Sequence, residues 1–145
     1  MSSEIDAICS DKLSLTYYPH FFSEREANQY FNDLYSNIHW REEIYQMFGK
    51  RILAPRLVAW YGDEKAIYPY SGVTHKPRPW NTTLRVIKKK VELFCCQQFN
   101  SVLLNLYRNG KDSMGWHADN ESVLGNKPVI ISISLGGQRI FYFKD

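Results

Sequence analysis

Hydrophobic side chains recur with a helical period in two separate parts of this chain, and this feature restricts the fold most strongly. The first part follows Ser23-Glu24-Arg25-Glu26, a capping box in which the serine and the glutamate satisfy each other's backbone donors. We predict a helix over about 23–37 and a second helix that begins near Asn81. The predicted buried stripe of the second helix consists of Leu84, Ile87, Val91 and Phe94.

Strand-like segments lie on both sides of the second helix. The segments 40–48, 56–61 and 101–107 have compositions that are typical of strands. Val129–Leu135 alternates between apolar and serine side chains, and Arg139–Phe143 follows it after two glycines, so we predict a hairpin. Helices followed by antiparallel strands indicate an α+β fold, and a length of 145 residues suits one domain.

The segment from Gly62 to Trp80 is rich in glycine, proline and tyrosine and shows no sustained period. Such a composition is typical of turns and loops. The segment is therefore either one long aromatic loop or a short hairpin around 68–72.

Composition excludes several classes of protein. Hydrophobic residues make up 44% of the chain, which favours a packed core over disorder. No apolar run approaches the length of about 18 residues that a membrane span needs. The first twenty residues lack the basic start and apolar middle of a secretory signal. Three cysteines form no disulfide framework, so we expect reduced thiols in a cytoplasmic or nuclear protein that is not secreted.

His117 and Asp119 are separated by one residue, the spacing at which side chains of an extended segment point the same way. An imidazole and a carboxylate can then converge on one metal ion. Two histidines and a carboxylate on one face of Fe(II) leave the opposite positions open for a co-substrate and O₂. The alternative is a pair of ordinary surface residues.

Asn105 and Tyr107 share the same spacing, on the segment that precedes this pair. Both side chains can donate a hydrogen bond to an acid ligand. The alternative makes Tyr107 a half-buried sheet aromatic and Asn105 an edge residue.

Several of these motifs, in this order, resemble the AlkB-like dioxygenases that repair alkylated DNA and RNA. The resemblance covers about residues 50–145, and it begins with Pro55-Arg56-Leu57 and the aromatic segment that contains Trp60 and Tyr68-Pro69-Tyr70. It continues with Asn-x-Tyr-x-x-Gly at 105–110 and Trp-His-x-Asp-x-Glu at 116–121. It ends with Ile-Ser-Leu-Gly at 133–136, followed by Arg139 and Phe141. The resemblance implies helices packed on a double-stranded β-helix, or jelly roll, in one domain over 1–145. The nucleotide-recognition lid would lie at about 55–80 and the jelly-roll core would begin at about 101–145.

For the metal and its co-substrate, the resemblance implies four residues. His117 and Asp119 would bind Fe(II) as catalytic ligands, and Asn105 and Tyr107 would hold 2-oxoglutarate. The implied reaction is oxidative demethylation of a base, in which O₂ is consumed with 2-oxoglutarate.

For the nucleic acid, the resemblance implies stacking of Trp60 on the damaged base, with Glu121 near its exocyclic edge. Tyr68 and Tyr70 would belong to a lid that grips the nucleotide. A base must leave its stack before chemistry can reach it, and aromatic side chains compensate for the lost stacking. The alternative places these aromatic residues in a small core cluster.

Basic residues permit a nucleic-acid partner without requiring one, because the formal net charge is only +3. Arg56 is predicted to contact phosphates, which would position a strand without reading its sequence. The run Lys88–Lys90 is more typical of a solvated helix surface. We expect a monomer that binds alkylated single- or double-stranded DNA or RNA and no membrane.

The implied iron site also needs a second histidine, and in this family it follows the His117 pair in the chain. His20, His39 and His75 all precede that pair. We therefore expect this ligand, the arginines that pair with 2-oxoglutarate and the distal jelly roll to lie beyond Asp145. Two other readings are a catalytically inactive nucleic-acid-binding fragment and a relative that hydroxylates protein or lipid.

Overall fold

The computed structural model describes residues 6–9, 14–47, 49–66, 68–70, 73–118 and 129–144. The chain divides into two compact units. One consists of Met1–Ser36 with Ile131–Asp145, and the other of Asn37–Ile130. The second unit contains most of the predicted site residues.

The first unit begins with an antiparallel hairpin of β1 (Asp6–Cys9) and β2 (Ser14–Tyr17). Helix α1 (Glu24–Asn37) follows, and it starts where the sequence predicts. The Ser23 amide donates to Glu26 Oε2 at 2.9 Å, and the Glu26 amide donates to Ser23 Oγ at 3.3 Å. This confirms the capping box.

The described residues 129–144 contain no helix or strand. The predicted strands at Val129–Leu135 and Arg139–Phe143 are therefore wrong for this structure, although the bend at Gly136-Gly137 is present. An alternating pattern shows which face a strand would bury, but a strand exists only when another strand satisfies its backbone groups. Consistent with this, Ile131 and Ile140 are exposed.

Gly136 is a position in the first unit that cannot accept a side chain. Its φ is +81°, and a Cβ built on it would lie 2.7 Å from the ring of Phe31. We expect Gly136→Ala to lower the free energy of unfolding by about 1–3 kcal/mol, since left-handed backbone strain and a clash add together. Urea unfolding would measure the change. Gly137→Ala is the matched control, because a Cβ there meets nothing within 4 Å. Equal effects of the two substitutions would contradict the prediction.

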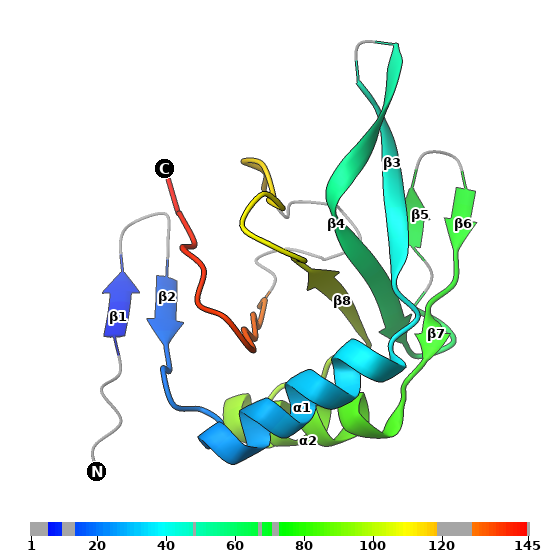
Figure 1. Ribbon diagram of the computed structural model, residues 1–145. Helices are drawn as coiled ribbons and strands as arrows, with labels where there is room; N and C mark the ends of the chain where they lie inside the picture. The colour runs from blue at the N-terminus through cyan, green and yellow to red at the C-terminus, as the bar shows by residue number, and fades with distance from the viewer. Residues whose placement is uncertain are drawn as a thin grey trace. The chain divides into compact units, whose positions relative to one another are not determined.

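The second unit is built around one long central strand, β4 (Lys50–Gly62). It pairs antiparallel with β3 (Arg41–Met47) and with β8 (Ser101–Leu106), and in parallel with the two-residue strand β7 (Arg78–Pro79) (Figure 1). The structure therefore mixes helices with mainly antiparallel sheet. All three strand predictions before residue 110 are confirmed.

Between β4 and β7 the chain forms a separate antiparallel hairpin of β5 (Tyr68–Tyr70) and β6 (Val73–His75). Of the two readings of the aromatic segment, the short hairpin is confirmed. The chain enters and leaves this hairpin at neighbouring positions of the sheet, because β7 pairs with the last two residues of β4.

Helix α2 (Thr82–Cys95) also begins as predicted, with the Leu84 amide donating to Asn81 Oδ1 at 2.8 Å. Leu84, Ile87 and Val91 are buried, but Phe94 is 52% exposed, so its place in the buried stripe is wrong. The helix ends one residue later, at Cys95, where Cys96 adopts φ +53°. Neither α1 nor α2, the helices of the described residues, is long and apolar enough to cross a membrane.

Candidate functional site

The register between β4 and β8 brings several predicted site residues to one face of the sheet. Trp60 pairs with Leu103, and Val58 pairs with Asn105. Paired residues of antiparallel strands point to the same side, as do residues two apart along a strand. Arg56, Trp60 and Asn105 therefore share one face, which we call the β4–β8 face. Tyr107 follows Asn105 at the same spacing, just past the end of β8.

Arg56 lies at the centre of a polar network on the β4–β8 face. It is 5% exposed. Its Nε donates to Asn105 Oδ1 at 2.9 Å, and one terminal nitrogen donates to the Tyr45 hydroxyl at 3.2 Å. The other terminal nitrogen donates to Glu43 Oε2 at 2.9 Å. Three acceptors on β3 and β8 thus bind the planar fork of donors that arginine presents.

This network corrects the role predicted for Arg56. A phosphate contact needs an accessible guanidinium, whereas this one is buried and already bonded to three side chains. The expectation rested on charge alone, and charge in a sequence does not distinguish a buried arginine from an exposed one. The carboxylate partner, Glu43, could have been suspected from its place in the neighbouring predicted strand.

The bond from Arg56 also fixes the orientation of the Asn105 amide. A guanidinium only donates hydrogen bonds, so the amide oxygen must face Arg56 and the amide nitrogen must face away. Asn105 is itself exposed. The residue therefore presents N–H donors on the accessible side of the sheet, which is the chemistry that a carboxylate co-substrate requires.

A tight turn connects β8 to the predicted metal ligands. Arg108 Nε donates to Asp112 Oδ2 at 2.8 Å, and the Arg108 amide donates to the same oxygen at 2.9 Å. Asp112 is 6% exposed, and the next amide, of Ser113, donates to Pro55 O at 2.9 Å. The hydrogen bond to Asp112 raises the pKa of Arg108 above its already high ordinary value, so Arg108 stays cationic at any working pH.

Asp112 is a structural residue that sequence reasoning missed. Its carboxylate closes the turn on Arg108, and the amide of the next residue, Ser113, joins the turn to Pro55 on β4. The signal for it is weak, because Arg-x-x-x-Asp spacing in a polar segment is common on protein surfaces.

The ring of His117 is oriented by a contact with the backbone. Its Nδ1 lies 2.9 Å from the carbonyl oxygen of Gly115, which can accept but not donate a hydrogen bond. Nδ1 is therefore the donor in this contact, and Nε2 is the atom that would bind a metal ion. Histidines that bind metals commonly make this kind of bond to a backbone carbonyl.

Of the other predicted site residues, the structure describes the side chain of Trp60. Trp60 is half-buried on the β4–β8 face. Tyr68 and Tyr70 both lie on β5, and their side chains fall outside the described part of the structure. Asp119 and Glu121 also lie outside it.

The donors that are described fit the two groups that the resemblance implies. Asn105 offers N–H donors to an acid, and Nε2 of His117 would be the atom that binds a metal ion. Within the described ranges, no three His, Cys, Asp or Glu side chains gather as metal ligands. Cys95 and Cys96 are free cysteines in the described part of the chain.

Comparison with known proteins identifies relatives over most of the chain. Residues 14–145 match the model of the 2OG-Fe(II) oxygenase superfamily. The human "Alpha-ketoglutarate-dependent dioxygenase alkB homolog 3" is 40% identical over 125 residues, which are 86% of this chain and 43% of that protein. The bovine "DNA oxidative demethylase ALKBH2" is 36% identical over 130 residues, which are 88% of this chain and 47% of that protein.

A plant protein of the same name, from Arabidopsis thaliana, is 28% identical over 134 residues, or 90% of this chain and 43% of its own length. The chain thus spans about half the length, or less, of these curated relatives. The chain belongs to the 2OG-Fe(II) oxygenase superfamily, and its relatives there are AlkB-like dioxygenases.

Proposed function

We propose that this chain takes part in the oxidative demethylation of alkylated bases in DNA or RNA, with Fe(II), O₂ and 2-oxoglutarate. A relative named as a DNA oxidative demethylase shares 36% of the aligned residues with it, and one named as an alpha-ketoglutarate-dependent dioxygenase shares 40%. The observation that carries the proposal is the β4–β8 face, where an aromatic side chain and an oriented amide lie on adjacent strands. A stacked base and an acid co-substrate could bind there side by side.

The iron centre, when it is bound together with 2-oxoglutarate and O₂, supplies the oxidising power that removes the N-methyl group. The chain's own residues bind and orient the reactants. His117 and Asp119 would hold the metal, with Nε2 of His117 as the binding atom. Asn105 and Tyr107 would donate hydrogen bonds to 2-oxoglutarate. Positioning by a fixed amide is efficient because no reorientation is needed when the co-substrate binds.

The substrate would be a base that has left its stack. Trp60 offers an aromatic face, and stacking of one base on such a side chain contributes about 1–3 kcal/mol to binding. Glu121 would lie near the exocyclic edge of that base. Tyr68 and Tyr70 would contact the nucleotide from the β5–β6 hairpin, as parts of a lid over about 55–80.

At the level of the fold, we propose that residues 1–145 belong to a single AlkB-like domain. Its core, from about residue 101 onward, would be a jelly roll, an arrangement of about eight strands. We further propose an intracellular protein, cytoplasmic or nuclear, that acts as a monomer.

Succinate release tests the proposal directly. The purified chain is supplied with Fe(II), 2-oxoglutarate and a single-stranded oligonucleotide that contains one N-methylated base. We expect succinate to form together with loss of the methyl group, and an unmethylated oligonucleotide of the same sequence to support far less of both. Omission of Fe(II) is the second control.

Three other outcomes would overturn this assignment for the chain. A folded chain that binds the oligonucleotide tightly, with or without Fe(II) and 2-oxoglutarate, and releases no succinate would be a nucleic-acid-binding protein. Succinate release that follows added peptide or lipid in place of oligonucleotide would identify a hydroxylase of those molecules. A folded chain that neither binds nor turns over any of them would have neither activity.

A further inference from the structure

The β5–β6 hairpin is connected to the sheet by a narrow base. β4 ends at Gly62, and the chain returns at β7, where Arg78 pairs with Tyr61 and Pro79 pairs with Gly62. This ladder is only two residues long, and proline has no amide hydrogen to donate to it. Backbone pairing alone therefore holds the two ends of segment 64–79 weakly.

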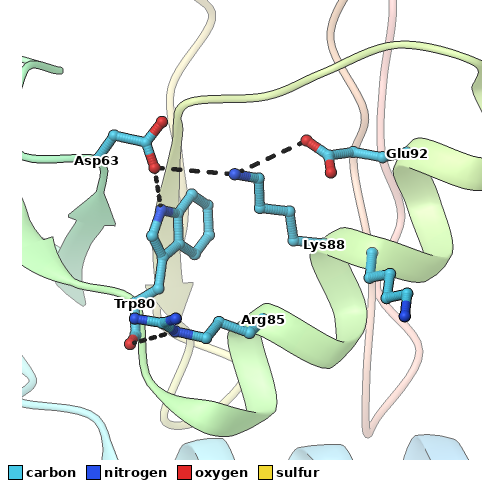
Figure 2. Close-up of a pocket in the computed structure, with 6 residues that line it drawn as sticks. Asp63, Trp80, Arg85, Lys88 and Glu92 are labelled. Atoms are coloured by element: carbon cyan, nitrogen blue, oxygen red, sulfur yellow. Dashed lines mark hydrogen bonds and ion pairs between the residues drawn. The ribbon is translucent and has the colours of Figure 1, made fainter.

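Side chains supply a second connection at this base. Asp63 immediately follows β4, and Trp80 immediately follows β7. The indole Nε1 of Trp80 donates to Asp63 Oδ1 at 2.7 Å (Figure 2). Asp63 is also held by its backbone, because its amide donates to Asn100 O at 2.7 Å. One hydrogen bond thus joins the residue before the segment to the residue after it.

Helix α2 presents a lysine to both partners. Lys88 Nζ lies 4.8 Å from the centre of the Trp80 ring and 3.8 Å from Asp63 Oδ1. Glu92, one helical turn further on, lies 3.8 Å from the same nitrogen. In Figure 2 the Lys88 side chain reaches from the helix toward the space between the indole and the two carboxylates. Arg85 Nε adds a bond of 3.2 Å to the Trp80 carbonyl oxygen.

Trp80 is thereby held through its ring nitrogen, its ring face and its backbone oxygen. A cation over an aromatic face contributes about 0.5–1 kcal/mol at exposed sites, and an ion pair at 3.8 Å contributes less when it is solvated. Each contact alone is modest. Together they fix the relative positions of the two ends of the segment and of helix α2.

We propose that Asp63, Trp80 and Lys88 form a clamp that positions the β5–β6 hairpin for nucleic acid. The clamp limits the orientations of the hairpin before the strand binds, so less conformational entropy is lost on binding. These three residues are positioning residues that need not touch the substrate. The inference rests on the proposed function, because it assigns the hairpin to the nucleotide-binding surface.

Two substitutions separate the parts of the clamp. Trp80→Phe keeps an aromatic ring for Lys88 and removes the N–H that Asp63 accepts. Asp63→Asn keeps an oxygen acceptor for Trp80 and removes the charge that faces Lys88. Glu64→Gln is the matched control, since Glu64 is an exposed neighbour of Asp63 for which the described residues show no hydrogen bond or ion pair.

Binding and local opening are measured on the same proteins. Fluorescence anisotropy gives the Kd for a methylated single-stranded oligonucleotide at one fixed salt concentration. Hydrogen–deuterium exchange gives the protection of amides in segment 64–79 and in α2. We expect Trp80→Phe to raise the Kd by about three- to tenfold and to speed exchange in the hairpin, with a smaller effect for Asp63→Asn. Glu64→Gln should match the unmodified chain in both measurements.

A purely structural role would give a different result. If the cluster only anchors α2, exchange would rise in the helix, the melting temperature would fall, and the hairpin amides would not change relative to the helix. That result, or unchanged Kd values in all variants of a chain that binds, would overturn the inference. Lack of binding by the unmodified chain would instead overturn the proposed function, and hairpin exchange would still show whether the clamp holds the segment.

Discussion

Replacement of His117 by alanine should reduce methyl-dependent succinate release by about 100-fold or more, because a ligand of the metal is lost outright. The bond from Nδ1 to Gly115 O leaves Nε2 as the binding atom, and alanine has no substitute for it. The measurement is the initial rate with Fe(II), 2-oxoglutarate and the methylated oligonucleotide. Titration of the chain with Fe(II) under anaerobic conditions should show a parallel loss of affinity.

His20→Ala is the matched control, since His20 is an exposed histidine in the other compact unit. It removes the same chemical group and should leave both the rate and the Fe(II) affinity unchanged. If the His117 variant keeps more than about a tenth of the rate, which is far from the loss expected of a ligand, His117 does not bind the metal.

Arg56→Ala should lower the free energy of unfolding by about 2–3 kcal/mol, because it removes three hydrogen bonds from the β4–β8 face. This loss of stability is smaller than the loss expected when a fully buried ion pair is broken, because the Glu43 side chain is 32% exposed and partly solvated. The same variant should bind 2-oxoglutarate more weakly, because the Asn105 amide is then free to rotate. Urea unfolding and a 2-oxoglutarate titration measure the two effects separately.

Arg51→Ala is the control for loss of an arginine from the same strand, since Arg51 is exposed on β4. It should change stability by no more than about 0.5 kcal/mol. Arg56→Lys should recover little, because one ammonium group cannot reproduce the planar fork. Wild-type stability in Arg56→Ala would show that the network contributes nothing net. Weaker oligonucleotide binding with unchanged 2-oxoglutarate affinity would restore the phosphate role.

Local signals in the sequence predict local structure well in this chain. Ser23 with Glu26, and Asn81 alone, mark the starts of α1 and α2, because a capping side chain acts within one turn of its own residue. The spacing of Asn105 and Tyr107 likewise predicts a strand with both side chains on one face. Asn105 lies on strand β8, and Tyr107 follows the last residue of that strand. These inferences need no knowledge of distant parts of the chain.

Features that depend on distant partners are not predicted. The alternation in Val129–Leu135 is as clear as in any strand of the chain, yet these residues are unpaired with any other described strand. Arg56 is correctly assigned to a strand, but its burial depends on Glu43 and Asn105, which lie 13 and 49 residues away in the sequence. Phe94 fits the helical period but is 52% exposed near the end of α2, so the period alone does not establish burial.

Strand β4 pairs with β3, which precedes it directly in the sequence, and with β8, which follows much later. This difference bears on the order in which the sheet forms. β3 and β4 are adjacent in sequence, so their hairpin joins residues that are close along the chain. β8 arrives only after roughly 40 further residues, and pairing at such separation is slow. In the interval Arg56 already has Glu43 and Tyr45 as acceptors within the hairpin. We expect the hairpin to satisfy two sides of the guanidinium first, and Asn105 to complete the network when β8 pairs with β4.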